Sequence, residues 1–433
     1  MLLIHLSDIH FRHGEVGVPL DPNTHLRNEL LIDAEKMCSK LDKTPSAILI
    51  SGDIAYAGHT EEYTYALSWL EELADKCGTT TANIFIVPGN HDVVRSIAGK
   101  PMVKALHDQI KVADHLFLDT NIRGYLNDQD TGRALYESLD NYNLFAQQFF
   151  CDLKPPLRTL AKRDLMLNDG SILRLNGINS SFVSSASDKA GDIFVDPSYV
   201  QITREQGVEH LVLCHHPISW IRQGNVLSDH LNDVARIQLF GHDHTNRIDL
   251  KRDSVIVAAS AAHPDRTEHG WEPGYNLIEL NVDNSENSRK LRVSVHVRIW
   301  QNRPAQFIPK MDRDKDVFIN EIVLEAWSGI KRQPSVVTGT NIVNAKLSTA
   351  PESEPIGSGS DPMDNLRNIS VRFFKLKFSQ KSAIAGKLDL LENEDVNQPD
   401  FERFRSVFNR AHDRGLIEEL DKEVRAAEES IKK

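Results

Sequence analysis

The sequence has few cysteines, no long hydrophobic run and no excess of positive charge, and each absence excludes a class of protein. No apolar run approaches the ~20 residues that a membrane-spanning helix needs. The net charge of −12 argues against broad nonspecific nucleic-acid binding, although it leaves room for a local basic groove. The cysteines form no Cys-x-x-Cys pair, which excludes a zinc knuckle and predicts reduced, mostly buried thiols. These four residues are Cys38, Cys77, Cys151 and Cys214.

The rest of the composition is that of an ordinary globular protein. The chain has 433 residues, enough for one large domain and a smaller one. A candidate metal ligand, Asp8, lies so close to the N-terminus that cleavage of a signal peptide would remove it. We therefore expect a cytoplasmic protein without a membrane partner.

Five short apolar runs lead into residues that can bind a metal ion, and they carry most of the functional information. Runs rich in Val, Ile and Leu are typical of buried strands. Ligands collect at the carboxyl ends of such strands in open α/β sheets. The repetition predicts a metal centre. The runs and the residues that follow them are 2–6 with Asp8 and His10, 47–50 with Asp53, 84–87 with Asn90, 211–214 with His215, and 237–240 with His242 and His244.

The order of the periodic segments predicts an α/β domain over residues 1–340. Apolar residues recur at helical spacing between the first strands, which indicates a layered, largely parallel sheet. A helical insertion is expected at about 100–165, directly after the Gly-Asn-His-Asp segment. Alternating polar and apolar residues at 291–299 predict a second, more antiparallel sheet late in the domain.

The C-terminal part differs in composition from the rest of the chain. Residues 346–362 are rich in Pro, Gly and Ser, which predicts a flexible linker. Beyond it, residues 363–433 contain four segments with helical periodicity and no obvious catalytic set. We expect a small all-α module there.

The candidate ligands have chemistry suited to transition metals. Asp8 and His10 are two residues apart, so at an extended strand end both side chains would point to the same side. Asp53 follows a glycine in a turn, and its two carboxylate oxygens could bridge two cations. Carboxylates, an amide and imidazoles together favour Mn, Fe or Zn over Mg or Ca alone.

The ordered motifs Asp-x-His, Gly-Asp, Gly-Asn-His-Asp, His and Gly-His-x-His resemble the calcineurin-like metallophosphoesterase superfamily over roughly residues 1–300. The resemblance implies a layered αββα sandwich and two divalent metal ions, for which Mn²⁺ is preferred and Fe or Zn are alternatives. It implies that one metal is bound by Asp8, His10, Asp53 and His244, and the other by Asp53, Asn90, His215 and His242. His215 is chosen over His216 because it directly follows the strand and lies two residues before Pro217.

The resemblance also implies a mechanism. A hydroxide that bridges the two metals would attack phosphorus in line. His91 would protonate the leaving alkoxide as general acid, with Asp92 placed to orient and charge it. The C-terminal module resembles helical effector-associated adaptors fused to enzymes in bacterial conflict systems. That resemblance implies a protein partner, and the alternative is a stabilising helical appendage.

Other residues near the motifs have simpler interpretations. His5 is expected to pack in the core, and Arg12 is a candidate phosphate contact. Four further histidines could line a substrate pocket, although solvated loop positions are the simpler expectation. They are His13, His59, His216 and His263.

Together these features predict a phosphoester hydrolase that favours phosphodiesters such as a nucleotide or a nucleic acid. One alternative is a nuclease of a defence or repair system, which a basic groove beside the metals would support and an acidic rim would count against. The other is a non-catalytic nucleotide-binding signalling adaptor.

Overall fold

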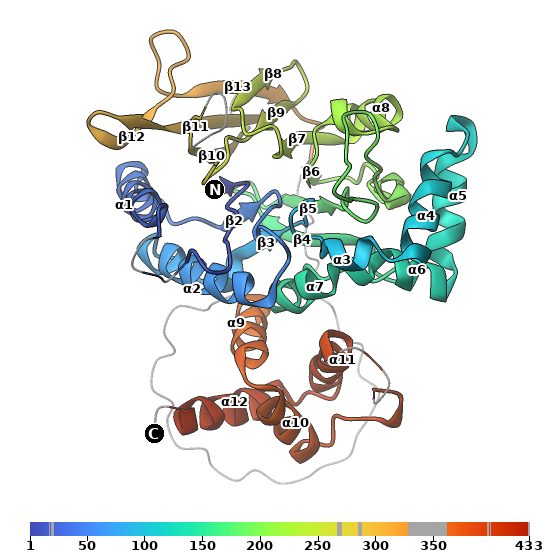
Figure 1. Cartoon of the computed structure of the whole chain (residues 1–433). Coiled ribbons are helices and arrows are strands. Elements are labelled where there is room, and N and C mark those ends of the chain that lie inside the picture. The colour runs from blue at the N-terminus through green and yellow to red at the C-terminus, as the bar shows by residue number, and fades with distance from the viewer. Residues whose placement is uncertain are drawn as a thin grey trace, which may run out of the picture.

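Two β-sheets packed face to face form the N-terminal region, and a separate group of helices forms the C-terminal module (Figure 1). The computed structural model describes residues 1–16, 18, 21–265, 271–284, 288–327, 362–395, 398 and 400–431. The predicted domain boundary at 340 and the predicted linker at 346–362, apart from Pro362, lie outside the described residues. Within these ranges, no helix combines the length and apolar character needed to cross a membrane.

The first sheet joins the earliest strands of the chain to the latest ones of the N-terminal region. Its strands are β1 (Leu2–Leu6), β2 (Ala47–Ile50), β3 (Ile84–Ile86), β10 (Gly274–Asp283), β11 (Lys290–Asn302), β12 (Ala305–Pro309) and β13 (Phe318–Val323). Their order is β12-β11-β10-β1-β2-β3, and β13 pairs with β11. The prediction of a separate antiparallel sheet is therefore wrong, because β10 pairs directly with β1. Alternation reveals which face of a strand is buried, but it does not reveal the partner strand.

The second sheet supplies the other ligand-bearing strands. Its strands are β4 (Leu160–Met166), β5 (Ile172–Ile178), β6 (Val208–Cys214), β7 (Ala235–Phe240), β8 (Arg247–Leu250) and β9 (Val255–Ala258). They lie in the order β4-β5-β6-β7-β9-β8, with parallel pairing from β5 to β9 and an antiparallel strand at each edge. The carboxyl ends of β6 and β7 therefore lie at the same edge of the sheet.

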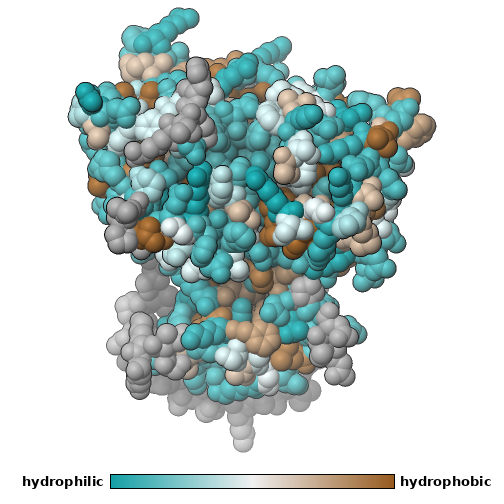
Figure 2. All heavy atoms as spheres, viewed as in Figure 1, coloured by the Kyte–Doolittle hydropathy of each residue, from teal (hydrophilic) through white to brown (hydrophobic). Residues whose placement is uncertain are grey.

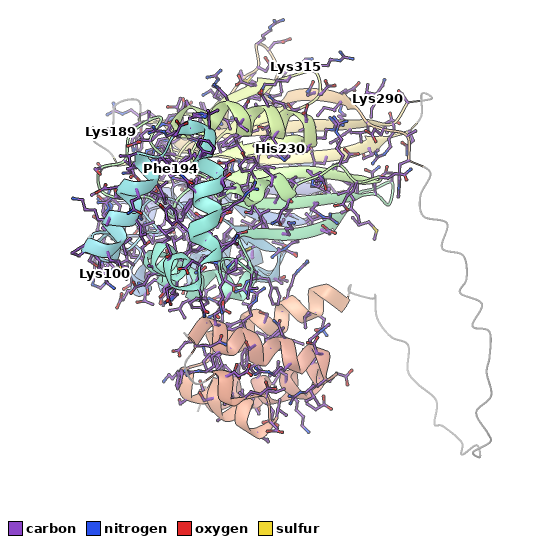
Figure 3. The ribbon with its side chains drawn as sticks, turned by 90° about the vertical axis from the view of Figure 1, so that its right-hand side faces the viewer. Lys100, Lys189, Phe194, His230, Lys290 and Lys315 are labelled. Atoms are coloured by element: carbon purple, nitrogen blue, oxygen red, sulfur yellow. The ribbon has the colours of Figure 1, made fainter. Side chains whose placement is uncertain are left out.

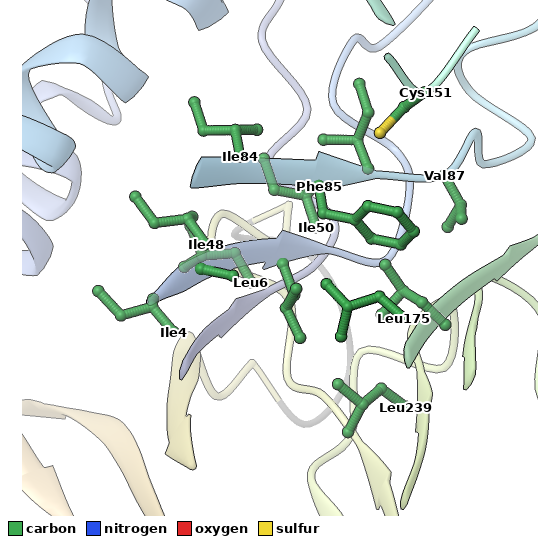
Figure 4. Packing of buried hydrophobic residues seen from close by; sticks show 14 of the residues in the cluster. Ile4, Leu6, Ile48, Ile50, Ile84, Phe85, Val87, Cys151, Leu175 and Leu239 are labelled. Carbon is green, nitrogen blue, oxygen red and sulfur yellow. The ribbon is translucent and has the colours of Figure 1, made fainter. Parts of the chain in front are cut away.

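Apolar side chains from both sheets fill the space between them. Figure 4 shows Ile50 and Phe85 of the first sheet packed beside Leu175 and Leu239 of the second. All four side chains are fully buried. This packing holds the ends of β1, β2 and β3 next to the ends of β6 and β7.

Helices surround the two sheets. In the N-terminal region they are α1 (Thr24–Leu41), α2 (Thr60–Lys76), α3 (Arg95–Ala98), α4 (Pro101–Lys111), α5 (Leu118–Asn127), α6 (Gln129–Tyr136), α7 (Asp140–Ala146) and α8 (Gly224–Val234). The short 3-10 helices are η1 (Thr81–Asn83), η2 (His115–Phe117), η3 (Glu137–Leu139), η4 (Gln147–Phe149), η5 (Pro197–Gln201), η6 (Ile218–Trp220) and η7 (Asn393–Asp395). Helix α8, which carries His230, covers the outer face of the second sheet (Figure 3). Helices α3 to α7 and η4 follow the Gly-Asn-His-Asp segment, and the last of them ends at Phe149. The predicted helical span of about 100–165 is therefore too long at its C-terminal end, where residues 160–166 form β4.

The C-terminal module consists of the four predicted helices, which are α9 (Pro362–Lys375), α10 (Phe378–Lys387), α11 (Asp400–Asp413) and α12 (Ile417–Ile431). Phe373, Phe404 and Phe408 are buried in its core. Helix α9 packs along η1 and η4 of the N-terminal region. On the face shown in Figure 2, hydrophilic residues cover most of both parts.

Candidate metal centre

Five loops at neighbouring strand ends carry the candidate ligands. The backbone pairing of β1 with β2 continues into the first two loops, where the amide of His10 donates to the carbonyl of Asp53 (3.0 Å). A further parallel bridge joins Phe11 to Ala55. The two loops are therefore fixed in register with each other. We name the five loops loop 1 (residues 8–13), loop 2 (53–59), loop 3 (89–92), loop 4 (215–217) and loop 5 (241–244).

The backbone of these loops is left-handed at most of the candidate ligands. A positive φ is uncommon for residues other than glycine and is concentrated at functional sites. The prediction that Asp8 and His10 share an extended strand end is therefore wrong, although their side chains do reach the same group. The ligand positions with positive φ are Asp8 (53°), His10 (53°), Asp53 (53°), His242 (71°) and His244 (54°).

Two glycines allow the loops to approach closely. A β-carbon at Gly89 would collide with the backbone nitrogen and Oδ1 of Asp53. A β-carbon at Gly241 would collide with Ser7 and would lie 3.0 Å from Oδ2 of Asp8. The glycines of the Gly-Asn-His-Asp and Gly-His-x-His motifs thus leave room for the two carboxylates.

One group of side chains gathers around Asp8. Nε2 of His244 lies 3.2 Å from Oδ1 of Asp8, and the ligand atoms of Asp8, His10 and His244 all lie within 4.8 Å of one another. Nε2 of His10 lies 3.2 Å from Oδ2 of Asp53. The structure thus brings together the four residues predicted for the first metal.

A second group gathers around Asn90. Its Oδ1 lies 3.0 Å from Nε2 of His215 and 3.1 Å from Nδ1 of His242. Oδ2 of Asp53 lies 3.4 Å from Nε2 of His215, so the same carboxylate oxygen faces both groups. This is the arrangement expected of a bridging ligand.

His216 is buried, and the expectation of a solvated loop position for it is wrong. Its ligand atom lies within 4.8 Å of those of His215 and His242. Nδ1 of His216 bonds to Oγ of Ser180 (2.8 Å), while its buried Nε2 has no partner in the described part of the chain. Only His215 of the two also approaches Asp53.

The electrostatics of the two groups fit divalent cations. Among the described residues, the ion pairs of Asp8 and Asp53 are with histidines and none is with lysine or arginine. Burial opposes ionisation of Asp53, yet His215 and His10 hold the pKa of Asp53 well below its ordinary value. Burial favours the neutral ring of His215, but Asp53 and Asp8 raise the pKa of His215 to about 9. Buried carboxylates require such compensation, which bound cations would also provide.

His91 is held beside the two groups by its backbone and by its ring. Its amide donates to Oδ1 of Asp53 (2.8 Å), and its Nδ1 lies 2.7 Å from the carbonyl oxygen of Tyr56. That bond requires a hydrogen on Nδ1, which leaves Nε2 as the atom available to a substrate. Burial lowers the pKa of His91, and the charge of Asp53 opposes this shift.

The prediction that Asp92 orients His91 is wrong. Both carboxylate oxygens of Asp92 accept bonds from elsewhere: from the amides of Gly89 (2.9 Å) and Ala55 (2.9 Å) and from the hydroxyl of Tyr63 (2.9 Å). Burial and the nearby Asp53 raise the pKa of Asp92 to about 6. Asp92 therefore joins loop 2 to loop 3, and the carbonyl of Tyr56 orients the His91 ring.

The rim near His10 contains a paired arginine. The guanidinium of Arg12 lies 3.9 Å from the centre of the Tyr56 ring. It also pairs with Asp265 (3.1 Å) and Glu15 (3.6 Å). Arg12, Glu15 and Asp265 line a cavity of about 210 Å³ together with His10.

The remaining histidines divide between core and surface. His5 is fully buried and bonds to Ser51, which confirms its predicted core position. His13 and His59 are exposed as expected. His263 is buried instead, and its Nδ1 donates to the carbonyl oxygen of Ile9 (2.9 Å). All four cysteines are free and buried, as predicted.

Sequence reasoning missed three residues that support the site, which are Tyr56, Glu62 and Tyr63. Tyr56 acts through its backbone carbonyl, which no side-chain motif reveals. Glu62 could have been noticed as an acidic residue in the first turn of α2. Tyr63 lies on the buried face of the same helix, where apolar periodicity alone indicates a packing residue.

Two family models match the chain. The model for calcineurin-like phosphoesterases matches residues 1–246, and the model for the GTPase-associated adaptor domain matches residues 365–426. The glycerophosphodiester phosphodiesterase GpdQ of Enterobacter lignolyticus is 35% identical over 95 residues. That match spans 21% of this chain and 30% of the length of GpdQ.

Solved structures with low sequence identity also match part of the chain. Vps29 of Entamoeba histolytica, in its complex with zinc, is 10% identical with a TM-score of 0.30, over 75% of this chain and 99% of that one. GAP50, described as the anchor in the inner membrane complex of Plasmodium, is 10% identical with a TM-score of 0.37, over 76% and 90%. Because the first family model covers 246 of 433 residues, the chain belongs to the calcineurin-like phosphoesterase family.

Proposed function

We propose that this protein is a phosphoester hydrolase that uses two divalent cations, with Mn²⁺ preferred and Fe or Zn as alternatives. One observation carries the proposal: Oδ2 of Asp53 faces both His10 (3.2 Å) and His215 (3.4 Å), between two groups of metal-binding side chains. Asp8, His10, Asp53 and His244 would hold one cation, and Asp53, Asn90, His215 and His242 the other. When bound, the cations would supply an activated water for in-line attack and neutralise charge on the phosphoryl oxygens.

The protein's own groups supply the remaining chemistry. With Nδ1 donating to the Tyr56 carbonyl, a protonated His91 can donate from Nε2 to the leaving alkoxide. Arg12 can turn from its carboxylate partners toward a phosphoryl oxygen, because it lies on the same tyrosine ring that packs against His91 (4.9 Å between ring centres). Arg12 is therefore proposed as a phosphate contact.

A phosphodiester of small size, such as a nucleotide, is the proposed substrate class. Among the described residues beside His10, one guanidinium faces two carboxylates, Glu15 and Asp265. Such a rim repels the backbone of a nucleic-acid strand, whose binding rests on cationic contacts. The partial match to a glycerophosphodiester phosphodiesterase also supports a diester.

The test is hydrolysis of bis(4-nitrophenyl) phosphate by metal-stripped protein reconstituted with Mn²⁺. Asp53→Ala should lose both metal binding and turnover. His91→Ala should retain metal and lose turnover by a factor on the order of 10²–10⁴, the usual contribution of a general acid. His13→Ala, an exposed histidine of loop 1, is the matched control. Absence of turnover of any phosphoester with any transition metal would refute the proposal, and tight nucleotide binding without turnover would favour a signalling adaptor.

The C-terminal module is proposed to bind a protein partner. The adaptor family match supports this role, and the helical pattern contains no catalytic set of its own. Pull-down with the full chain and with a chain ending at residue 345 would test it. A partner retained equally by both chains would contradict the proposal.

A further inference from the structure

Glu62, at the start of α2, connects the first two ligand loops. Its Oε1 accepts a bond from the amide of His13 in loop 1 (3.2 Å). Its Oε2 accepts bonds from the amides of Ala57 and His59 in loop 2 (3.0 Å each). The side chain is 1% exposed, so these bonds are shielded from water. A single buried carboxylate therefore fixes the far ends of two loops that carry Asp8, His10 and Asp53.

Tyr63, the next residue, contacts the carboxylate of Asp92, which joins loop 2 to loop 3. Its hydroxyl donates to Oδ1 of Asp92 (2.9 Å), and Asp92 accepts the amides of Ala55 in loop 2 and Gly89 in loop 3. The Tyr63 ring stacks on Phe145 of α7, with 5.0 Å between ring centres and 24° between planes. The tyrosine is thus held by a helix while it holds the carboxylate that joins two ligand loops.

Glu62 and Tyr63 both lie on α2, so a single packed helix fixes the positions of both side chains. Helix α2 is 17 residues long and packs through a buried face that includes Leu70 and Leu73. Ligand loops with left-handed backbone conformations persist only when their surroundings hold them. Groups that hold metal ligands in place typically change metal affinity by ~10–100-fold when removed.

We propose that Glu62 and Tyr63 are positioning residues for the metal centre. They set the spacing of loops 1, 2 and 3, and hence the distances between Asp8, Asp53 and Asn90. This inference rests on the proposed metal centre. Both side chains are buried and bond to the loops, so we expect their effect first in metal affinity and only through it in turnover.

The experiment measures Mn²⁺ binding by calorimetry on the metal-stripped full chain, together with the melting temperature with and without Mn²⁺. The variants are Glu62→Gln, which loses one acceptor oxygen, and Tyr63→Phe, which keeps the ring stack. Glu61→Gln and Tyr65→Phe are matched controls on the same helix, and Glu61 is exposed. We expect each variant to bind Mn²⁺ about tenfold more weakly, and the double variant more weakly still. Both controls should match the wild type.

The two temperatures separate positioning from general stability. A positioning role predicts that the rise in melting temperature on adding Mn²⁺ shrinks in the variants, while the metal-free melting temperature changes little. Variants with wild-type Mn²⁺ affinity would overturn the inference, as would an equal fall in melting temperature with and without metal. A wild-type chain that binds Mn²⁺ but hydrolyses no phosphoester would refute the proposed activity and leave the inference standing. A wild-type chain that binds no metal would overturn both.

Discussion

The ligand loops and the C-terminal module are built in opposite ways. In the loops, buried carboxylates accept backbone amides, and five candidate ligands adopt positive φ. In the module, buried aromatic rings pack between regular helices, as for Phe373 against Phe404 (6.1 Å between centres). Apolar packing thus fixes the arrangement of helices in the module, whereas the arrangement of the loops depends on hydrogen bonds between segments that are distant in sequence.

The junction between the two parts combines apolar packing with polar contacts. Phe150 of the N-terminal region packs on Phe408 of α11 (5.8 Å between ring centres). Close by, the fully buried carboxylate of Asp152 pairs with Arg158 (2.5 Å) and with Arg405 of α11. Apolar contact and a buried ion-pair network therefore hold the module in its place.

The largest effect is expected from removing a core ring of the module. Phe404→Ala should destabilise the module by about 3–5 kcal/mol, because the ring is fully buried and its loss leaves a cavity. Hydrogen exchange should show faster exchange in α9 to α12, with Mn²⁺ affinity unchanged. Phe378→Ala, at a half-exposed ring of α10, is the control. A fall in metal affinity would show that the two regions are not independent.

A similar but more local effect is expected at the junction. Asp152→Ala should destabilise docking of the module by about 1.5–3 kcal/mol, because it removes the buried carboxylate that pairs with Arg405 of α11, whereas Arg158 keeps its second partner, Glu402. Limited proteolysis should then cleave between the two parts more readily. Asp413→Ala, an exposed position on the same module, should behave as wild type. Unchanged proteolysis of Asp152→Ala would contradict a junction held by this network.

In the loops, a substitution with a smaller effect on stability should lower the affinity for Mn²⁺. Gly89→Ala places a methyl group against Asp53 and should cost about 1–3 kcal/mol as the loops move apart. Unlike the module variants, it should also weaken Mn²⁺ binding, which calorimetry would measure. Gly124→Ala in α5, where a β-carbon meets no atom within 4 Å, is the control. Retention of full metal affinity would show that the loops tolerate separation.

The smallest effect concerns a buried histidine away from both regions. Burial lowers the pKa of His107 in α4 to about 4 from an ordinary 6.5. The unfolded chain therefore binds a proton that the folded chain does not between those values, so stability is lost as pH falls below 6.5. The expected loss from this residue is about 1 kcal/mol between pH 7 and pH 5.5. Denaturant unfolding of His107→Leu should show a shallower pH dependence, and an unchanged slope would exclude the effect.

Much of the fold was predictable because its segments carry local signals. The apolar runs at 2–6 and 47–50 coincide with β1 and β2, and all four helices of the module lie where periodicity placed them. The edge strands β8, β12 and β13 were missed, since they carry few buried residues and thus little apolar pattern. The partner of β10 was also assigned wrongly, because pairing between segments some 270 residues apart leaves no local trace.

The candidate site shows the same division. Motif spacing named Asp8, Asp53 and His215 as ligands, and the structure brings them together. Motif spacing could not show that the Asp92 carboxylate accepts bonds from backbone amides and not from the His91 ring. Its partners depend on the conformation of loops 2 and 3.

By itself, then, the sequence determined the candidate ligands, the strands that carry them and the helical nature of the C-terminal module, since each depends on residue chemistry and short-range periodicity. Tertiary structure decided which strands share a sheet, which carbonyl orients His91, and how Glu62 and Tyr63 support the ligand loops. The physical reason is that these features are hydrogen bonds between distant segments. Their partners are chosen by the packing of two whole sheets and a helix, which no short stretch of sequence specifies.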